Sequence, residues 1–115
     1  MIKKVMPKKL VEIGIAEGGT TSTIVKCLAM LGLKSTMYSV DLNQNFYHDS
    51  SLRTGYEYDR IKNDIGENVT HEFMLGKSIA GQIEKIGNNI DMVIIDTTHK
   101  LPGEILDFLV VLPYI

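Results

Sequence analysis

A glycine-rich turn between two apolar runs constrains the fold of this chain more than any other feature. The first run, residues 10–14, is short and β-branched, and it leads into the sequence GIAEGG at residues 14–19. Apolar residues then recur at helical spacing over residues 20–32, and a second apolar run over residues 36–41 ends in Asp41. A strand, a glycine-rich turn, a helix and a second strand ending in an acid form a βαβ unit. Such a unit suits a nucleotide-like ligand, with the acid placed for the ribose hydroxyls.

Strand-like and helix-like patterns alternate along the rest of the chain. A polar loop is predicted at residues 43–55 and a weakly helical stretch at 56–65. Two further strands are predicted at residues 69–75 and 91–96, and two helices at 79–86 and 105–112. The strands are nearly continuous apolar runs, which is typical of parallel sheets covered by helices on both faces. We therefore expect a single α/β domain over residues 1–115, with a Rossmann-like, doubly wound parallel sheet of about four strands.

The last predicted strand, residues 91–96, creates an edge problem. It is the most hydrophobic of the set, so it should lie centrally in the sheet with a strand on either side. A doubly wound sheet usually has five or more strands, and the sequence therefore predicts a core that lacks its C-terminal strands. The alternative is that another chain covers the bare edge, which would make the protein a homo-oligomer.

Composition limits the classes of binding partner and the cellular compartment that we expect for this protein. The chain is 44% hydrophobic and 23% charged with a net charge of −2, which fits a soluble globular domain and gives no electrostatic footprint for nucleic acid. The single cysteine, Cys27, excludes an intramolecular disulfide and is expected to be a buried apolar residue. The sequence contains no signal peptide or membrane-spanning run, so a cytoplasmic protein with a small-molecule substrate is expected.

The turn departs from both phosphate-binding glycine motifs. A P-loop requires lysine where Thr20 stands, and the dinucleotide fingerprint requires glycine where Ala16 stands. Glu17 adds a negative charge where a phosphate would lie. The pattern therefore favours a ligand without phosphates. S-adenosylmethionine meets that condition, because it combines ribose hydroxyls with a positive sulfonium and amine, and its carboxylate can meet backbone N–H groups at a helix start.

Two acids are placed for such a cofactor. Glu12, near the end of the first strand, would face the amine, and Asp41 would accept both ribose hydroxyls. The structural alternatives are an exposed strand end for Glu12 and a turn or helix cap for Asp41. The glycines between the two acids favour the ligand.

In this order the motifs resemble class I S-adenosylmethionine-dependent methyltransferases, in particular the branch of sugar O-methyltransferases and cephalosporin-hydroxylase-like proteins. The resemblance covers about residues 10–113. The segments that carry it are EIG at 12–14 with GG at 18–19, VD at 40–41, LGKS at 75–78 and IDTTH at 95–99. It implies that the chain is a truncated methyltransferase core. It also implies roles at two further places: Gly14 and Gly18 would lie against the methionine part of the cofactor, and Gly76 and Ser78 would border the adenine. Ser78 also suits a helix cap.

The element D-x-x-H after the last strand suggests the chemistry. Methyl transfer to a hydroxyl needs that hydroxyl deprotonated, by a base of near-neutral pKa or by a divalent metal. His99 suits the base and Asp96 suits an oxygen ligand of Mg²⁺, which are the roles that the resemblance implies for this aspartate and histidine. The alternatives are a surface histidine and a helix-capping aspartate. In the resembled enzymes the acidic pair that completes the metal site follows a fifth strand, which residues 1–115 do not supply.

The predicted function is therefore S-adenosylmethionine-dependent O-methylation of a small-molecule or sugar hydroxyl. Three alternatives stay open at this point. They are a cephalosporin-hydroxylase-like enzyme of the same fold, a non-catalytic module that binds cofactor or oligomerises, and another nucleotide binder of the Rossmann type, against which Ala16 and Glu17 argue.

Overall fold

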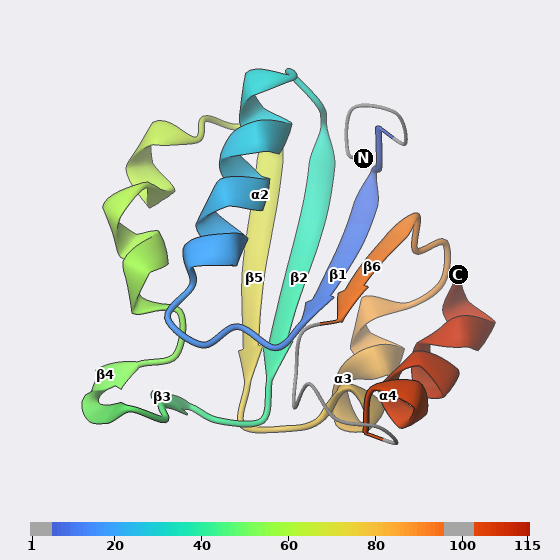
Figure 1. Cartoon of the computed structure of the whole chain (residues 1–115). Coiled ribbons are helices and arrows are strands. Elements are labelled where there is room, and N and C mark those ends of the chain that lie inside the picture. Colours follow the sequence, from blue (N-terminus) through green and yellow to red (C-terminus); the bar gives the residue numbers. More distant parts are fainter. Residues whose placement is uncertain (1–5, 96–102) are drawn as a thin grey trace.

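A four-stranded parallel sheet with helices on both faces forms the centre of the molecule (Figure 1). The computed structural model describes residues 6–95 and 103–115. The sheet has the order β5-β2-β1-β6, and its strands are β1 (Lys9–Ile13), β2 (Ser35–Asp41), β5 (Val69–Leu75) and β6 (Met92–Ile95). The helices are α2 (Gly19–Met30), α3 (Ile79–Ile86) and α4 (Gly103–Val111). The predicted Rossmann-like α/β architecture is confirmed.

Alternate side chains of the central strand β1 face opposite layers. Leu10 packs with Val25 and Leu28 of α2, whereas Val11 lies in a second cluster with Ile83 of α3 and Val111 of α4. Full burial of one such aliphatic side chain contributes about 1.5–3 kcal/mol. Two separate apolar clusters therefore hold helices on the two faces, as the continuous apolar strands predict.

The register brings the carboxyl ends of the strands to one edge. Ile13 at the end of β1 lies opposite Val40 of β2 and Ile95 of β6. Asp41 at the end of β2 lies opposite Leu75 of β5. The turns that follow these strands therefore begin side by side, which is where ligands bind in open α/β sheets.

The polar stretch between β2 and β5 is more ordered than predicted. Residues 43–55 contain an antiparallel hairpin of β3 (Asn45–Phe46) and β4 (Asp49–Arg53) rather than a loop alone. The ring centroids of Phe46 and Tyr56 lie 5.6 Å apart, so an aromatic contact supports the hairpin. Asp49 Oδ1 also accepts a hydrogen bond from Ser51 N at 3.0 Å, a local turn contact.

The weakly helical stretch forms two short 3₁₀ helices, η1 (Tyr56–Arg60) and η2 (Lys62–Asp64). Tyr58 and Ile61, which pack inward, are three residues apart, and this spacing matches the three residues per turn of a 3₁₀ helix. These helices lie on the same face of the sheet as α2, because Tyr58 and Ile65 join its apolar cluster. A last 3₁₀ helix, η3 (Leu112–Tyr114), follows α4.

The sequence predicts that Cys27 is a buried apolar residue. This prediction was wrong, because Cys27 is only half-buried.

Strand β6 lies at an edge of the described sheet, with β1 as its neighbour. Large apolar side chains are also exposed on nearby α4, on η3 and at the residue after it, at Leu106, Phe108, Leu109, Leu112 and Ile115. Both features agree with an edge that another chain could cover, but pairing with a second copy stays a prediction. Among the described residues, no helix is both long and apolar enough to cross a membrane.

Candidate functional site

The carboxyl edge brings together three of the residues singled out from the sequence. Gly14 N donates a hydrogen bond to Val40 O at 2.8 Å, and Gly76 N donates to Asp41 O at 3.0 Å. These bonds continue the strand pairing into the turns after β1 and β5. Gly14, Asp41 and Gly76 therefore lie along one short stretch of the edge, and their shared role at a ligand stays a prediction.

The glycine-rich turn depends on left-handed backbone conformations. Gly14 and Gly18 have φ angles of +97° and +99°, and Ala16 between them has φ +55°. Alanine in this region costs roughly 1–2 kcal/mol more than glycine, so the turn is held in place by its surroundings. Gly18 is the N-cap of α2, and no side chain caps this helix start.

Asp41 is one of the groups that hold the turn. Its Oδ2 accepts hydrogen bonds from Ile15 N at 2.9 Å and Ala16 N at 3.4 Å, and its Oδ1 accepts from Asn43 N at 2.9 Å. The turn-capping alternative is therefore observed. A carboxylate has about four acceptor positions, and only the bonds from Ile15 N and Asn43 N lie within the usual N–H···O range, so two positions are open to ribose hydroxyls. The ribose role stays a prediction that is compatible with the cap.

Glu12 lies beneath the turn and is not an exposed strand end. Only 1% of the residue is exposed, and its Oε1 accepts hydrogen bonds from Thr21 Oγ at 2.5 Å and Ser39 Oγ at 2.8 Å. That structural alternative was wrong, while the predicted contact with a cofactor amine stays a prediction.

Sequence reasoning missed the polar partners of Glu12. Ser39 is fully buried on β2, and its Oγ also lies 2.8 Å from Nε2 of His71 on β5. The signal was the alternation within β2, since Ser39 occupies the same face as buried Met37. A polar residue at an inward position indicates a buried hydrogen-bond partner.

His71 is uncharged at neutral pH. Burial disfavours its charged form and nearby Arg53 adds repulsion, which together lower its pKa to about 4. The ring is enclosed by Tyr58 and Phe73, each with a centroid 4.5 Å away. A neutral histidine can act as donor and acceptor at once.

This lowered pKa should couple the stability of the domain to pH. An unfolded histidine titrates near 6.5, so between pH 6.5 and about 4 the unfolded chain binds the extra proton. We expect this residue to reduce the free energy of unfolding by up to about 1.4 kcal/mol per pH unit as the pH falls through that window. Urea denaturation at pH 7 and 5 measures it. His71→Gln should remove most of the difference, whereas the same change at exposed His48 should not. A pH dependence that persists in His71→Gln would contradict the assignment.

A second unpredicted feature is the segment that covers the turn. Gly55 N donates to Ala16 O at 2.8 Å, and Glu57 N donates to Glu17 O at 2.9 Å. A Cβ atom built on Gly18 would lie 2.9 Å from Gly55 Cα, so the two backbones are in direct contact. The start of η1 therefore packs on the outside of the glycine-rich turn.

The beginning of α2 is surrounded by negative charge. The carboxylates of Glu57 and Glu17 lie 3.5 and 3.8 Å from the position that a Cβ atom would take on Gly19. The positive end of the helix dipole favours both acids here. They would repel any anion at the same place, both a phosphate and the carboxylate that the sequence predicts at this helix start.

The adenine side of the predicted site is formed by the turn after β5. Gly76 has φ +87°, and a Cβ atom there would lie 2.6 Å from Nε2 of Gln44, so the hairpin segment reaches this turn. Ser78 occupies the N-cap position of α3, but its side chain makes no capping hydrogen bond. The role of either residue at an adenine stays a prediction.

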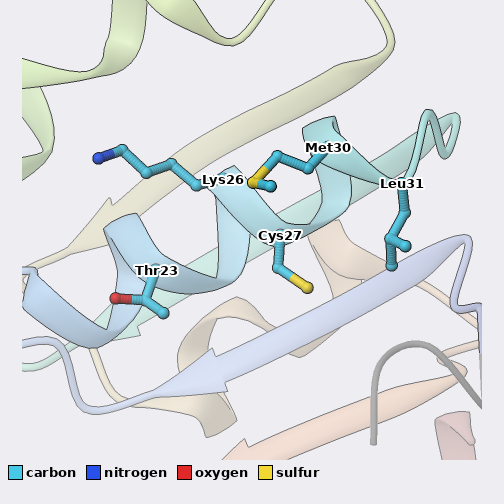
Figure 2. A pocket seen from close by; sticks show the side chains of 5 residues that line it. All are labelled: Thr23, Lys26, Cys27, Met30 and Leu31. Atoms are coloured by element: carbon cyan, nitrogen blue, oxygen red, sulfur yellow. The ribbon is translucent and has the colours of Figure 1, made fainter.

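A shallow hollow on the flank of α2 lies apart from these residues. Figure 2 shows the side chains that line it, Thr23, Lys26, Cys27, Met30 and Leu31, all from α2 and the residue after it. None of the predicted site residues contributes to it. The predicted site is therefore the carboxyl edge and not this hollow.

Comparison with protein families assigns the chain. The profile of a family described as a methyltransferase domain matches residues 11–115. The chain belongs to this family. The match runs through β1, the glycine-rich turn, Asp41 and the turn after β5, so the whole carboxyl edge of this methyltransferase domain lies within it. Neither curated proteins nor solved structures give a significant match. The narrower resemblance to sugar O-methyltransferases and cephalosporin-hydroxylase-like proteins stays a prediction.

The predicted metal and base lie outside the described residues. Asp96 and His99 both fall in the gap between residues 95 and 103. Within the described parts of this methyltransferase domain, no three His, Cys, Asp or Glu side chains gather as they would to bind a metal ion. The Mg²⁺ role of Asp96 and the base role of His99 stay predictions.

Proposed function

We propose that this methyltransferase domain binds S-adenosylmethionine at the carboxyl edge of its sheet and methylates a hydroxyl group of a small molecule or sugar. The observation that carries the proposal is the position of the Asp41 carboxylate, at the end of β2 and against the glycine-rich turn. A carboxylate at this place suits two vicinal ribose hydroxyls. Methyl transfer is the chemistry of the family to which the chain belongs.

The charges around the turn support a cofactor without phosphates. Glu17 and Glu57 flank the start of α2, and Glu12 lies beneath the turn. Three carboxylates favour a ligand that carries positive charge. The sulfonium and amine of S-adenosylmethionine supply such charge, whereas a nucleotide di- or triphosphate would add repulsion.

An exposed apolar side chain lies on the adenosine side of the proposed site. Leu42 directly follows Asp41 and is 66% exposed, which leaves an apolar surface beside the proposed ribose acid. An adenine ring has two large apolar faces, and covering Leu42 with one of them would remove both surfaces from water. Gly76 N donates to Asp41 O at 3.0 Å, so the turn after β5 lies beside the same acid.

The reaction requires two contributions, one from the cofactor and one from the chain. S-adenosylmethionine, when bound, supplies an activated methyl group with a neutral thioether as leaving group. The acceptor hydroxyl must lose its proton, and His99 is the residue we assign to accept it. A divalent metal held by Asp96 would lower the pKa of that hydroxyl.

Calorimetry with S-adenosylhomocysteine tests the proposal. We expect one binding site per chain, and no measurable heat with NADH or ATP at the same concentration, because both carry phosphates. The double variant Glu17→Gln, Glu57→Gln provides a control. It removes two negative charges that repel phosphate and leaves Asp41 unchanged, so it should reduce the difference in affinity between S-adenosylhomocysteine and ATP. Binding of ATP or NADH by the wild-type chain without binding of S-adenosylhomocysteine would overturn the proposal.

The non-catalytic alternative has one observation in its favour. The exposed apolar side chains of α4 and η3 lie in the part of the molecule where β6 forms the edge. A module that assembles through this surface would need no acceptor site. A chain that binds S-adenosylhomocysteine and shows no methyl transfer to any hydroxyl acceptor would favour it.

A further inference from the structure

A buried polar chain crosses the sheet beneath the glycine-rich turn. It runs from Glu12 on β1 through Ser39 on β2 to His71 on the edge strand β5, with 2.8 Å from Glu12 Oε1 to Ser39 Oγ and 2.8 Å from Ser39 Oγ to His71 Nε2. Ser39 and Glu12 are 0% and 1% exposed. Three adjacent strands thus contribute one side chain each to one hydrogen-bonded line.

We propose that Ser39 and His71 are positioning residues that fix the buried Glu12 carboxylate beneath the turn, where its charge acts on the amine of the cofactor. The inference rests on the proposed function, because it assumes that an S-adenosylmethionine amine lies near Glu12. It adds two residues, on strands that do not carry the turn, to the set that determines cofactor binding.

Counting the hydrogens gives the direction of both hydrogen bonds between Glu12, Ser39 and His71. A serine hydroxyl has one hydrogen, and that of Ser39 is donated to Glu12 Oε1. Ser39 Oγ must therefore accept from His71, which requires the hydrogen of the neutral imidazole to be on Nε2. Both of these bonds thus donate in the direction of Glu12, which fixes its Oε1 as an acceptor.

The line of hydrogen bonds is held in place at its His71 end. The His71 ring packs against both Tyr58 and Phe73, with 4.5 Å between centroids in both cases. A second hydroxyl, that of Thr21 on α2, donates to the same Oε1. Contacts from β2 and α2 therefore restrict rotation of the carboxylate. Since an electrostatic contact with an amine depends on where the carboxylate points, loosening this anchor should weaken binding of the amine and leave binding of the adenosine part unchanged.

Two ligands separate these parts of the cofactor. S-adenosylhomocysteine carries the amine, whereas 5′-methylthioadenosine has the same adenosine and sulfur without the amino acid portion. We expect Ser39→Ala and His71→Phe to weaken binding of S-adenosylhomocysteine roughly tenfold, as for loss of a hydrogen bond to a charged group. Binding of 5′-methylthioadenosine should change by less than about twofold. His71→Phe preserves an aromatic ring packed against Tyr58 and Phe73, so it provides a second variant should Ser39→Ala fold poorly.

Two further variants serve as controls. His71→Gln retains an N–H donor in place of Nε2 and should restore most of the affinity. Ser35→Ala removes another buried hydroxyl of β2, one that donates to Pro7 O at 2.6 Å at the opposite end of the strand. It should leave the affinities for both ligands unchanged.

The outcomes distinguish the inference from its premise. Equal weakening of both ligands in Ser39→Ala and His71→Phe, or no weakening of either, would overturn the positioning role. A wild-type chain that binds neither ligand would instead refute the proposed function, and the inference would fall with it.

Discussion

Replacing Gly18 by alanine should destabilise the domain by about 3 kcal/mol. Its φ of +99° costs an L-residue roughly 1–2 kcal/mol, and the added Cβ would lie 2.9 Å from Gly55 Cα and 3.1 Å from Gly55 C and O. These are backbone atoms, so no side chain can rotate away to relieve the clash. Overpacking of this kind typically adds 1–3 kcal/mol. Urea denaturation of the variant measures the loss.

Gly32 provides the matched control. It also has a left-handed backbone, with φ +67°, but a Cβ atom there would have no neighbour within 4 Å. Gly32→Ala should therefore cost only the conformational part, about 1 kcal/mol. Equal losses at the two positions would show that the contact between the turn and Gly55 contributes nothing to stability.

The sheet and its helices could be predicted because each signal was local. The apolar run at residues 10–14 and the helical spacing after it depend on neighbours within a few positions. Asp41 was placed correctly at the edge for the same reason, as an acid at the end of an apolar run.

The contact between Gly18 and Gly55 could not be predicted, because it joins segments 37 positions apart through backbone atoms. Nothing in the residue types near Gly55 specifies the turn as its partner. The sequence predicts only a loop at residues 43–55, because the two strands there are short and exposed, and the aromatic contact of Phe46 with Tyr56 shows why a hairpin forms. Long-range contacts of this kind decide local structure where local propensity is weak.

The polar chain beneath the turn was missed for a different reason. Serine and histidine within a strand are usually exposed on its polar face, and β5 is an edge strand where that is common. The burial of Ser39 and the partial burial of His71 follow from α2 and η1, which cover that face. The sequence therefore predicts a role for Glu12, whereas the packing of α2 and η1 determines that Ser39 and His71 are its partners.

Replacing Asp41 by alanine should weaken binding of S-adenosylhomocysteine at least 100-fold. Two hydrogen bonds from ribose hydroxyls to a carboxylate contribute roughly 1.5–3 kcal/mol each, and their loss accounts for that factor. Part of the effect would come from the turn, because Ile15 N and Ala16 N lose their acceptor. Calorimetry measures the total change, and Asp41→Asn, which keeps one acceptor oxygen, should have an intermediate effect.

A ligand that lacks one hydroxyl separates the ribose contact from the effect on the turn. The wild-type chain should prefer S-adenosylhomocysteine to its 2′-deoxy counterpart, because the deoxy ligand leaves the Asp41 carboxylate short of a donor. Asp41→Ala should bind the two equally. Asp49→Ala is the control for a lost turn contact, since Asp49 accepts from Ser51 N in the exposed hairpin at 3.0 Å. It should leave the preference intact. If Asp41→Ala kept the preference of the wild-type chain, Asp41 would be a turn cap alone, and the ribose would have to bind elsewhere on the carboxyl edge.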